Sequence, residues 1–442
     1  MRMILNKLTL VIAASSVSML SQNVLAKYCI KPPSNSYDDI SCLYDGLARV
    51  KQDLMYGYID GEGLEVIKPQ YLRAGDFYEG YAQISTDQGS GFIDKTGKII
   101  VAPTYEEVDI FSEGLAVVVR KFSIFDYRRG YVNTLGQEII PTEYQSAQYF
   151  KHGLGVVKQN GKWGALDQSG KVIISIEYDD IESFSEGMAR IRKGLKYGFI
   201  DETGKIAIPI HYRSARDFSD EFASVEKDGK WGFIDKNETE VVPFKYDWAY
   251  SFSEGLAPVS LGDNVGYINK MGTTVIPSNY DRADPFEHGF ARVWQSDKVG
   301  LIDLNGKIIV PTLYDELWYK TENTSLSLPT KEPVIVKKDD KYGFVDIGGT
   351  LIVTPQYNLV SHFWYEIASV RLNDKAGFIN KKGKVIIPII YDSVTQISEN
   401  LIRVKLNGEY DFIDRTGKTV HLPPFHEARS FSESSISFKS ND

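Results

Sequence analysis

Cysteine and histidine are scarce in this chain of 442 residues, which contains two cysteines and six histidines. The histidines are spread along the sequence, at His152, His211, His288, His362, His421 and His426. Zinc and other metal sites need several such ligands at short, characteristic spacings, and neither a CxxC nor a His-Glu-x-x-His motif is present. A Gly-x-Ser-x-Gly nucleophile elbow is also absent. The sequence therefore predicts no bound metal, no cofactor and no enzymatic activity.

Positive charge is also in the minority, with 50 lysines and arginines against 59 acidic residues and a net charge of -9. Nucleic acids and anionic lipids attract proteins through clustered lysine and arginine. The overall balance argues against a general affinity for either, and nucleic acid is not an expected partner. Local basic patches are still compatible with this overall negative charge.

Long apolar runs are missing after the first 26 residues, so we expect no membrane span in the mature chain. The N-terminus begins with Arg2 and Lys7, continues with an apolar stretch over Leu8–Leu20, and reaches small residues at Ala26. This is the pattern of a secretory signal peptide. The alternative of an anchor helix is disfavoured because the stretch is shorter than the roughly 20 residues that span a bilayer. We expect cleavage after Ala26 and export to the periplasm or the cell exterior.

The two cysteines, Cys29 and Cys42, both lie in the short segment 27–43 that precedes the first repeat. Export would place them in an oxidising compartment, where disulfides form. We predict that they pair and hold this segment as an N-terminal cap, with a stabilisation of roughly 3 kcal/mol in the chain-entropy picture.

An internal repeat organises the rest of the chain. Its register is set by one column of glycines, which is completed by Asp411 in the last copy: Gly57, Gly91, Gly130, Gly164, Gly198, Gly232, Gly266, Gly300, Gly343 and Gly377. Most neighbouring members are 34 residues apart. An aromatic residue follows each member at the same distance: Tyr71, Tyr105, Tyr144, Tyr178, Tyr212, Tyr246, Tyr280, Tyr314, Tyr357, Tyr391 and Phe425. Eleven such copies indicate a tandem array.

Turn chemistry recurs three residues after each glycine of the column. Aspartate or asparagine stands there in every copy: Asp60, Asp94, Asn133, Asp167, Asp201, Asp235, Asn269, Asp303, Asp346, Asn380 and Asp414. Three residues further on the sequence has glycine, except at Glu238. This pairing favours a turn between antiparallel strands. The same aspartates leave calcium binding as an alternative, although each turn offers only one carboxylate or amide.

The residues around each turn predict strands. In one copy they are Phe222–Glu226, Lys230–Asp235 and Glu240–Pro243, which gives a three-stranded meander. The period of 34 is also that of a helical repeat, but the frequent glycine turns and short β-branched blocks favour strands. The segment 178–187 could form one helical turn before the next copy.

The motifs Gly161-Lys162-Trp163-Gly164 and Gly229-Lys230-Trp231-Gly232, with their downstream proline, tyrosine and Phe-Ser-Glu-Gly landmarks, resemble the WG (KWG) repeat of bacterial proteins. The resemblance covers about residues 43–434. It departs from the pattern in one respect, because tryptophan stands before the glycine only at Trp163 and Trp231. The resemblance implies a β-rich repeat array without assigned catalysis, often on exported proteins, and implies no ligand.

Taken together, these patterns predict an all-β array of eleven units over residues 44–434, with a tail at 435–442. Units of this size cannot bury a core alone and must stack on their neighbours. We expect an elongated or superhelical body, with two propeller-like lobes as the alternative. An insertion at 317–333 could mark a division of the array.

Function is expected where the chain departs from its period. The insertions at 121–129 and 317–333 supply candidate partner contacts at Phe122, Phe125, Tyr127, Arg128, Arg129, Trp318 and Tyr319. The alternative is that both are tolerated surface loops. We predict a non-enzymatic binding or scaffold protein for a protein or cell-envelope polymer. Carbohydrate or peptidoglycan binding through an exposed row of aromatics is the second hypothesis, and an unrecognised enzyme is the third.

Overall fold

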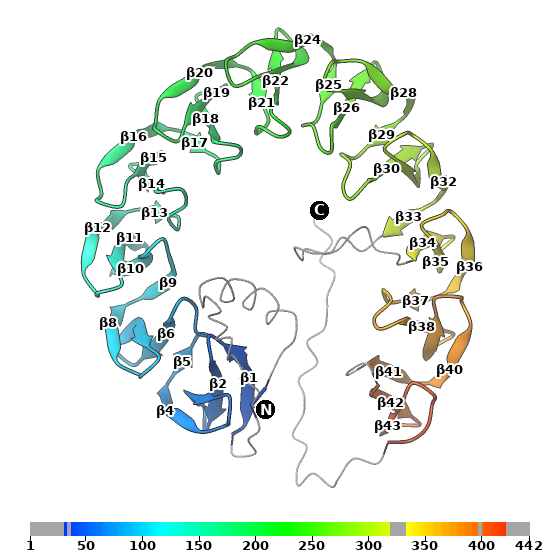
Figure 1. The fold of residues 1–442 in the computed structure, drawn as a ribbon, viewed down its shortest axis with the longest axis horizontal. Helices are drawn as coiled ribbons and strands as arrows, with labels where there is room; N and C mark the ends of the chain where they lie inside the picture. The colour runs from blue at the N-terminus through cyan, green and yellow to red at the C-terminus, as the bar shows by residue number, and fades with distance from the viewer. Residues whose placement is uncertain (1–30, 33–36, 319–332, 397–399, 421–442) are drawn as a thin grey trace, which may run out of the picture. The chain divides into compact units, whose positions relative to one another are not determined.

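The computed structural model describes residues 31–32, 37–318, 333–396 and 400–420 (Figure 1). Within these ranges the regular structure is entirely β, and no helix long and apolar enough to cross a membrane occurs. The predicted signal peptide, Cys29, Tyr319, Phe425 and the tail at 435–442 lie outside the described residues. The chain forms two compact units, residues 1–212 and 213–442. The division therefore falls between Tyr212 and Arg213 and not at the insertion 317–333.

The first unit contains five antiparallel sheets of four strands, each formed by strands that follow one another in the chain. They are β1 (Asp39–Tyr44), β2 (Leu47–Gln52), β3 (Met55–Asp60) and β4 (Glu65–Tyr71); β5 (Arg73–Ala74), β6 (Tyr81–Thr86), β7 (Gly89–Asp94) and β8 (Ile99–Tyr105); β9 (Glu107–Ser112), β10 (Leu115–Ser123), β11 (Asp126–Asn133) and β12 (Glu138–Tyr144); β13 (Ser146–Ala147), β14 (Gly155–Gln159), β15 (Lys162–Leu166) and β16 (Val172–Tyr178); β17 (Asp180–Ile181), β18 (Met188–Lys193), β19 (Lys196–Asp201) and β20 (Ile206–Tyr212).

The second unit contains five more sheets of four strands and a last sheet of three among its described residues. They are β21 (Ser214–Ala215), β22 (Ala223–Lys227), β23 (Lys230–Ile234) and β24 (Glu240–Tyr246); β25 (Trp248–Ala249), β26 (Leu256–Leu261), β27 (Asn264–Asn269) and β28 (Thr274–Tyr280); β29 (Arg282–Ala283), β30 (Phe290–Gln295), β31 (Lys298–Asp303) and β32 (Ile308–Tyr314); β33 (Glu316–Trp318), β34 (Val334–Lys338), β35 (Lys341–Val345) and β36 (Leu351–Tyr357); β37 (Leu359–Val360), β38 (Ile367–Leu372), β39 (Lys375–Asn380) and β40 (Val385–Tyr391); β41 (Ser393–Gln396), β42 (Ile402–Leu406) and β43 (Glu409–Ile413).

The eleven sheets confirm the predicted all-β tandem array, but the unit has four strands where three were expected. The additional strand lies just after the column tyrosine, in the segment for which a helical turn was considered. In β17, Asp180 pairs with Arg192 and Ile181 with Ile191. The flanking amides also donate to that neighbouring strand, with Glu182 N 2.9 Å from Arg190 O. The helical turn is therefore wrong, because these backbone groups are satisfied across the sheet.

The glycine column marks a bulge where the fourth strand passes over the third. Tyr56 pairs with Tyr71 and Tyr58 with Ile67, so the fourth strand advances by four residues while the third advances by two. A Cβ on Gly57, which lies between the two tyrosines, would be 2.4 Å from the carbonyl oxygen of Ile67. Only glycine leaves room for this crossing. In the last sheet Asp411 takes the position, its side chain is exposed, and the sheet described there has no fourth strand.

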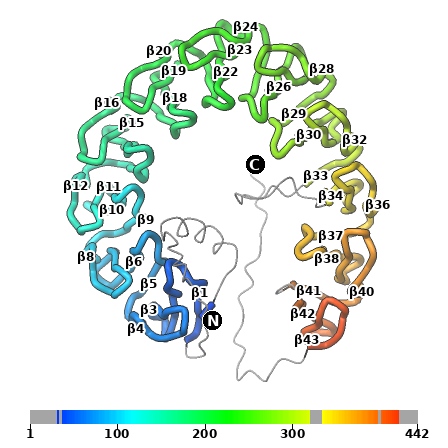
Figure 2. Tube along the Cα trace, in the orientation of Figure 1, coloured from blue at the N-terminus to red at the C-terminus, as the bar shows by residue number. Residues whose placement is uncertain are grey.

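The apolar core lies between successive sheets. In one cluster Tyr58, Ile67 and Tyr71 of the first sheet pack with Ile84 and Ile93 of the second. Within each unit, sheets that follow one another in the chain lie side by side, as the trace in Figure 2 shows. The column tyrosines sit at these junctions, and most of them are buried. The prediction that one copy completes the core of the next is confirmed.

The predicted turn column also forms as expected. In the turn after β19, Oδ1 of Asp201 accepts hydrogen bonds from the backbone amides of Thr203 at 2.9 Å and Lys205 at 3.0 Å. Asn269 does the same through its amide oxygen in the second unit. The side-chain oxygen caps amides that the turn would otherwise leave unpaired.

Candidate binding surface at the extended hairpin

One hairpin is longer than its counterparts. In the other described sheets the two central strands have five or six residues each, whereas β10 has nine and β11 has eight. Their pairing continues beyond Arg120 and Arg128 to Lys121 with Tyr127 and Ser123 with Asp126. At about 3.3 Å per residue, the three additional residues of β10 extend the hairpin by about 10 Å. The predicted insertion at 121–129 is therefore a protruding β-hairpin.

Large apolar side chains gather at its end. The turn consists of Ile124 and Phe125, which are 71% and 92% exposed, and the neighbouring Phe122 is 61% exposed. Most of the shorter hairpins turn on aspartate, asparagine, serine or glycine, and Leu54 and Leu195 are the apolar exceptions within the described chain. A single exposed leucine is ordinary on a protein surface, whereas several adjacent apolar side chains indicate a contact site.

Basic side chains lie below this apolar end. Arg128 Nε is 2.5 Å from Oδ1 of Asp126, and Arg129 Nη1 donates to the carbonyl of Gln145 at 2.6 Å. Lys121 Nζ lies 5.5 Å from the centre of the Tyr127 ring. Neither Lys121 nor Arg129 forms an ion pair with another described residue. The hairpin therefore combines an apolar end with uncompensated cations.

A pocket of about 530 Å³ adjoins the base of the hairpin. The hairpin supplies Arg120, Lys121 and Phe122 to its wall, and Arg73 adds a third cation. The remaining lining is mostly polar and includes two carboxylates: Leu72, Ser85, Thr86, Asp87, Gln88, Gly89, Ser90, Thr104, Tyr105 and Glu106.

Arg120 is held firmly at this pocket. Its guanidinium carbon lies 4.2 Å from the centre of the Tyr105 ring, and Nη2 is 3.1 Å from Glu138 Oε2. The Tyr105 hydroxyl donates to the same carboxylate oxygen at 3.2 Å. Burial raises the pKa of Tyr105, and the nearby Glu138 carboxylate acts in the same direction. The phenol therefore stays a neutral hydrogen-bond donor near neutral pH.

The second insertion contributes differently at its described base. Trp318 lies in β33 and packs against the core cluster that contains Phe344 and Tyr357, with its ring 5.8 Å from that of Tyr342. It is half-buried and contributes to the junction between two sheets. Its neighbour Tyr319, the last of the predicted contacts, lies outside the described residues.

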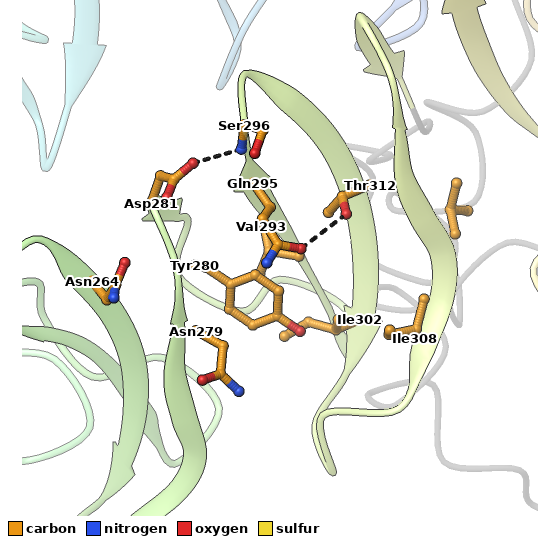
Figure 3. A pocket seen from close by; sticks show the side chains of 11 residues that line it. Asn264, Asn279, Tyr280, Asp281, Val293, Gln295, Ser296, Ile302, Ile308 and Thr312 are labelled. Atoms are coloured by element: carbon orange, nitrogen blue, oxygen red, sulfur yellow. Dashed lines mark hydrogen bonds between the residues drawn. The ribbon is translucent and has the colours of Figure 1, made fainter.

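A second pocket, also of about 530 Å³, lies in the other unit between neighbouring sheets (Figure 3). Its polar lining is almost neutral: Asn264, Asn279, Gln295, Ser296 and Thr312, with Tyr280 beside them and Asp281 as the one charged group. Oδ2 of Asp281 already accepts a hydrogen bond from the Ser296 amide at 2.6 Å. The amides and hydroxyls are thus the groups that could meet a neutral polar ligand.

The repeat aromatics do not form an exposed row. Tyr144, Tyr178, Tyr246 and Trp231 are all buried, and the aromatics at these positions in the other described copies are buried or half-buried, except Tyr410 in the last sheet, which is exposed. The other exposed aromatics lie outside these positions, as at Phe125 in the extended hairpin. The arrangement on which carbohydrate binding through repeat aromatics depends is absent from the described surface.

Metal ligands do not converge in the described part of the chain, where no group of three histidine, cysteine or acidic side chains could hold an ion. His152 and His288 are exposed turn residues with φ near 55°. Oδ1 of Asp201 and its counterparts already accept two backbone amides each, which leaves them poorly placed for calcium. His421 and His426 lie outside the described residues.

Comparison with known proteins assigns the repeat. Ten segments match the model of the WG-containing repeat: 56–88, 91–121, 130–163, 163–197, 197–231, 231–264, 266–298, 300–323, 342–375 and 377–410. The chain belongs to the WG-containing repeat family. The resemblance seen in the sequence is thus confirmed. The matches of this WG repeat chain omit residues 122–129, which include the end of the extended hairpin.

Curated proteins and solved structures add little to this assignment. No curated protein matches the chain. A eukaryotic initiation factor structure is 11% identical, with a TM-score of 0.35, and the alignment covers 68% of this chain and 94% of that one. The extracellular domain of the hybrid two-component system BT3049 from B. thetaiotaomicron is 10% identical with a TM-score of 0.21. That alignment covers 88% of this chain and 64% of the other. PorZ, a surface component of the type-IX secretion system of Porphyromonas gingivalis, is 8% identical with a TM-score of 0.24. That alignment covers 87% of this chain and 65% of PorZ. These values support no functional argument.

Two components of the candidate surface were missed by reasoning from the sequence. Ile124 stands between Phe122 and Phe125 in the printed insertion, so its apolar character beside two aromatics was an available signal. Arg73 belongs to no motif and lies far from the insertion along the chain. Only the fold brings it to the pocket wall that it shares with Lys121.

Proposed function

We propose that this WG repeat chain is an exported, non-enzymatic binding or scaffold protein whose contact surface is the extended hairpin. The observation that supports this most directly is the exposure of Phe122, Ile124 and Phe125 together at its end. Exposed apolar surface of this kind is unfavourable in water and is characteristic of surfaces that bind a partner. The repeat sheets provide the rigid support for the hairpin.

Export rests on the sequence of the first 26 residues and is part of the proposal. The same compartment would favour the predicted disulfide between Cys29 and Cys42. Cys42 lies half-buried in β1, while Cys29 is outside the described residues. Mass spectrometry of the alkylated, unreduced protein tests both points, since it gives the mature N-terminus and shows whether the two thiols are protected.

The binding role is tested by shortening the hairpin to the length of its neighbours. Replacing residues 121–127 by Asp-Gly joins Arg120 to Arg128 through the turn found at Asp228-Gly229. The intact and shortened proteins are used as bait with envelope fractions, and the recovered material is compared. We expect the shortened protein to lose its partners. Equal recovery by both would remove the hairpin from the contact surface.

A matched control keeps this test specific. Leu195 is 87% exposed at the turn between β18 and β19, in a hairpin of ordinary length in the same unit. The Leu195→Ser variant changes one exposed apolar side chain without touching the extended hairpin. It should recover the same partners as the intact protein.

Binding of a neutral glycan is a second candidate, favoured by the pocket lined with Asn279 and Gln295 (Figure 3). Amides and hydroxyls of this type pair with sugar hydroxyls. Calorimetry with soluble peptidoglycan fragments, using the Asn279→Ala and Gln295→Ala variants, tests it. Binding that is unaffected by both substitutions would place the glycan elsewhere.

A further inference from the structure

The extended hairpin has the features of a membrane-contacting tip. We propose that its end, residues 122–125, inserts into the surface of a bilayer that contains anionic phospholipids. This inference rests on the proposed role of the hairpin as the contact surface, and names the partner. It follows from the shape of the hairpin, the composition of its end and the charges below it.

The shape is convex. The apolar side chains are carried about 10 Å beyond the length of an ordinary hairpin in this chain, on a turn of only two residues, Ile124 and Phe125. Amphipathic elements that lie in a membrane interface bury their apolar face by about 5–10 Å. A protein partner would need a cavity matched to this protrusion, whereas the acyl region of a bilayer adapts to it. The reach of the hairpin therefore fits a bilayer surface.

The composition of the end fits the same environment. Phe122, Ile124 and Phe125 are the exposed apolar residues, and only Ser123 interrupts them. Transfer of such side chains from water into an apolar phase is favourable in proportion to the area buried. The backbones of β10 and β11 pair with each other up to Ser123 and Asp126, so the backbone groups that face the partner strand would enter the interface already hydrogen-bonded.

The basic side chains of the hairpin favour a lipid surface with negative charge. Residues 120–129 contain four basic side chains and one acidic one in a chain whose net charge is -9. Lys121 is exposed and has no carboxylate partner among the described residues, and Arg129 donates to a backbone carbonyl. Surface charges are screened beyond about 10 Å at 0.1 M salt, so a lipid phosphate at the hairpin responds to this local cluster more than to the acidic remainder of the chain.

The pocket at the base offers a place for a headgroup. Arg73, Arg120 and Lys121 line it together with hydroxyls such as Ser85 and Thr86, which suit phosphate oxygens. Asp87 and Glu106 also line it, so its net charge is only weakly positive. The pocket would orient a headgroup, while the apolar end and Lys121 would supply most of the affinity.

Vesicle flotation with the full mature chain tests the proposal. Vesicles of phosphatidylcholine alone are compared with an equimolar mixture of phosphatidylcholine and phosphatidylglycerol. We expect binding to the mixed vesicles, weakened by added salt, and little binding to the neutral ones. The double substitution Ile124→Ser with Phe125→Ser should lower the partition coefficient at least tenfold, which corresponds to about 1.4 kcal/mol. Lys121→Gln should reduce binding to the mixed vesicles alone.

Matched variants and a fluorescence measurement distinguish insertion of the hairpin end from unfolding of a variant. They also distinguish it from electrostatic attraction of the chain to the vesicle surface. Leu195→Ser and Lys196→Gln alter exposed residues of an ordinary hairpin and should bind as the intact chain does. Phe125→Trp should show a blue shift of its added fluorescence on mixed vesicles. Absence of binding by the intact chain, or equal binding by the Ile124/Phe125 double variant, would overturn the lipid proposal. If the shortened hairpin still loses a partner from a lipid-free protein fraction, the proposed function survives with a protein as its partner.

Discussion

The ammonium group of Lys230 lies 2.5 Å from Oδ1 of Asp247, and Oδ2 of the same aspartate accepts a hydrogen bond from the backbone amide of Gly262 at 2.7 Å. Lys230 begins β23, Asp247 follows the column tyrosine, and Gly262 lies in the central turn of the next sheet. One carboxylate thus links two successive repeats. Equivalent links occur at Lys162 with Asp179, Lys298 with Asp315 and Lys375 with Asp392. They give the lysine of the Lys-Trp-Gly motif a structural role.

This link predicts unequal effects for its two partners. Asp247→Ala removes both the ion pair and the acceptor for the Gly262 amide, whereas Lys230→Ala removes only the ion pair. Exposed ion pairs contribute little to stability because water and salt screen them. We expect a larger fall in the thermal unfolding midpoint for Asp247→Ala than for Lys230→Ala. The control Asp263→Ala, an exposed acid in the same turn with no described ion-pair partner, should leave the midpoint unchanged.

The glycine column predicts a large effect from a single methyl group. A Cβ on Gly91 would lie 2.2 Å from the carbonyl oxygen of Val101, which belongs to the strand that crosses above it. Neither backbone can withdraw without breaking the sheet, so Gly91→Ala should lower the free energy of unfolding by about 3 kcal/mol. Chemical denaturation measures this. Gly61→Ala is the control, because the nearest atom to its added Cβ is 3.6 Å away. Equal stability of the two variants would contradict this account of the column.

The features that repeat along the chain are the ones that the sequence could predict. The spacing of Gly57 and its counterparts, the turn aspartates and the column tyrosines each repeat along the chain, so the number of sheets and their junctions followed from pattern alone. The two-residue strand Asp180–Ile181 could not be found in this way, since periodicity needs more residues than it has. The link between Lys230 and Asp247 depends on how two sheets stack, and no local pattern reports that geometry.

The same limit applies to the candidate surface. Phe122 and Phe125 were predicted because they interrupt the period, and both are exposed. Trp318 interrupts it as well, but its ring packs at a junction between sheets. The breaks in the 34-residue spacing identified the insertions, whereas the burial of each side chain depended on the strand register around it.

The turn column predicts a loss of stability in acid. The hydroxyl of Thr203 donates to Oδ1 of Asp201 at 2.6 Å, and this hydrogen bond lowers the pKa of the carboxyl, with the turn amides acting in the same direction. A pKa that is lower in the folded chain stabilises the fold above the unfolded value near pH 4, and this contribution is lost as the pH falls through the folded value. Asp94, Asp167 and Asp414 share the arrangement with a neighbouring threonine or serine.

Asparagine provides the matched variant for this pH dependence. Asn269 occupies the column naturally and accepts the same two backbone amides without titrating. Asp201→Asn should therefore keep the turn and reduce the loss of stability between about pH 5 and pH 3. Denaturant midpoints measured across this range give the slope. An unchanged slope would show that Asp201 does not contribute to the acid transition.

Tyr131 lies at the base of the extended hairpin, and loss of its hydroxyl should lower the free energy of unfolding by less than the glycine substitution does. Tyr131 lies in β11, its ring is fully buried against Phe150 at 4.8 Å, and its hydroxyl donates to the carbonyl of Gln148 at 2.7 Å. Burial raises the pKa of Tyr131, so it remains a donor well into alkaline solution. Tyr131→Phe should lower the free energy of unfolding by about 1 kcal/mol, since it keeps the packing and leaves one acceptor unpaired. Phenylalanine stands at the equivalent Phe199, which indicates that the fold tolerates the change. The control is Tyr127→Phe, at a half-buried residue nearer the end of the same strand, and it should leave the denaturation midpoint unchanged. A similar loss of stability in both variants would show that the hydrogen bond to Gln148 is not the cause of that loss.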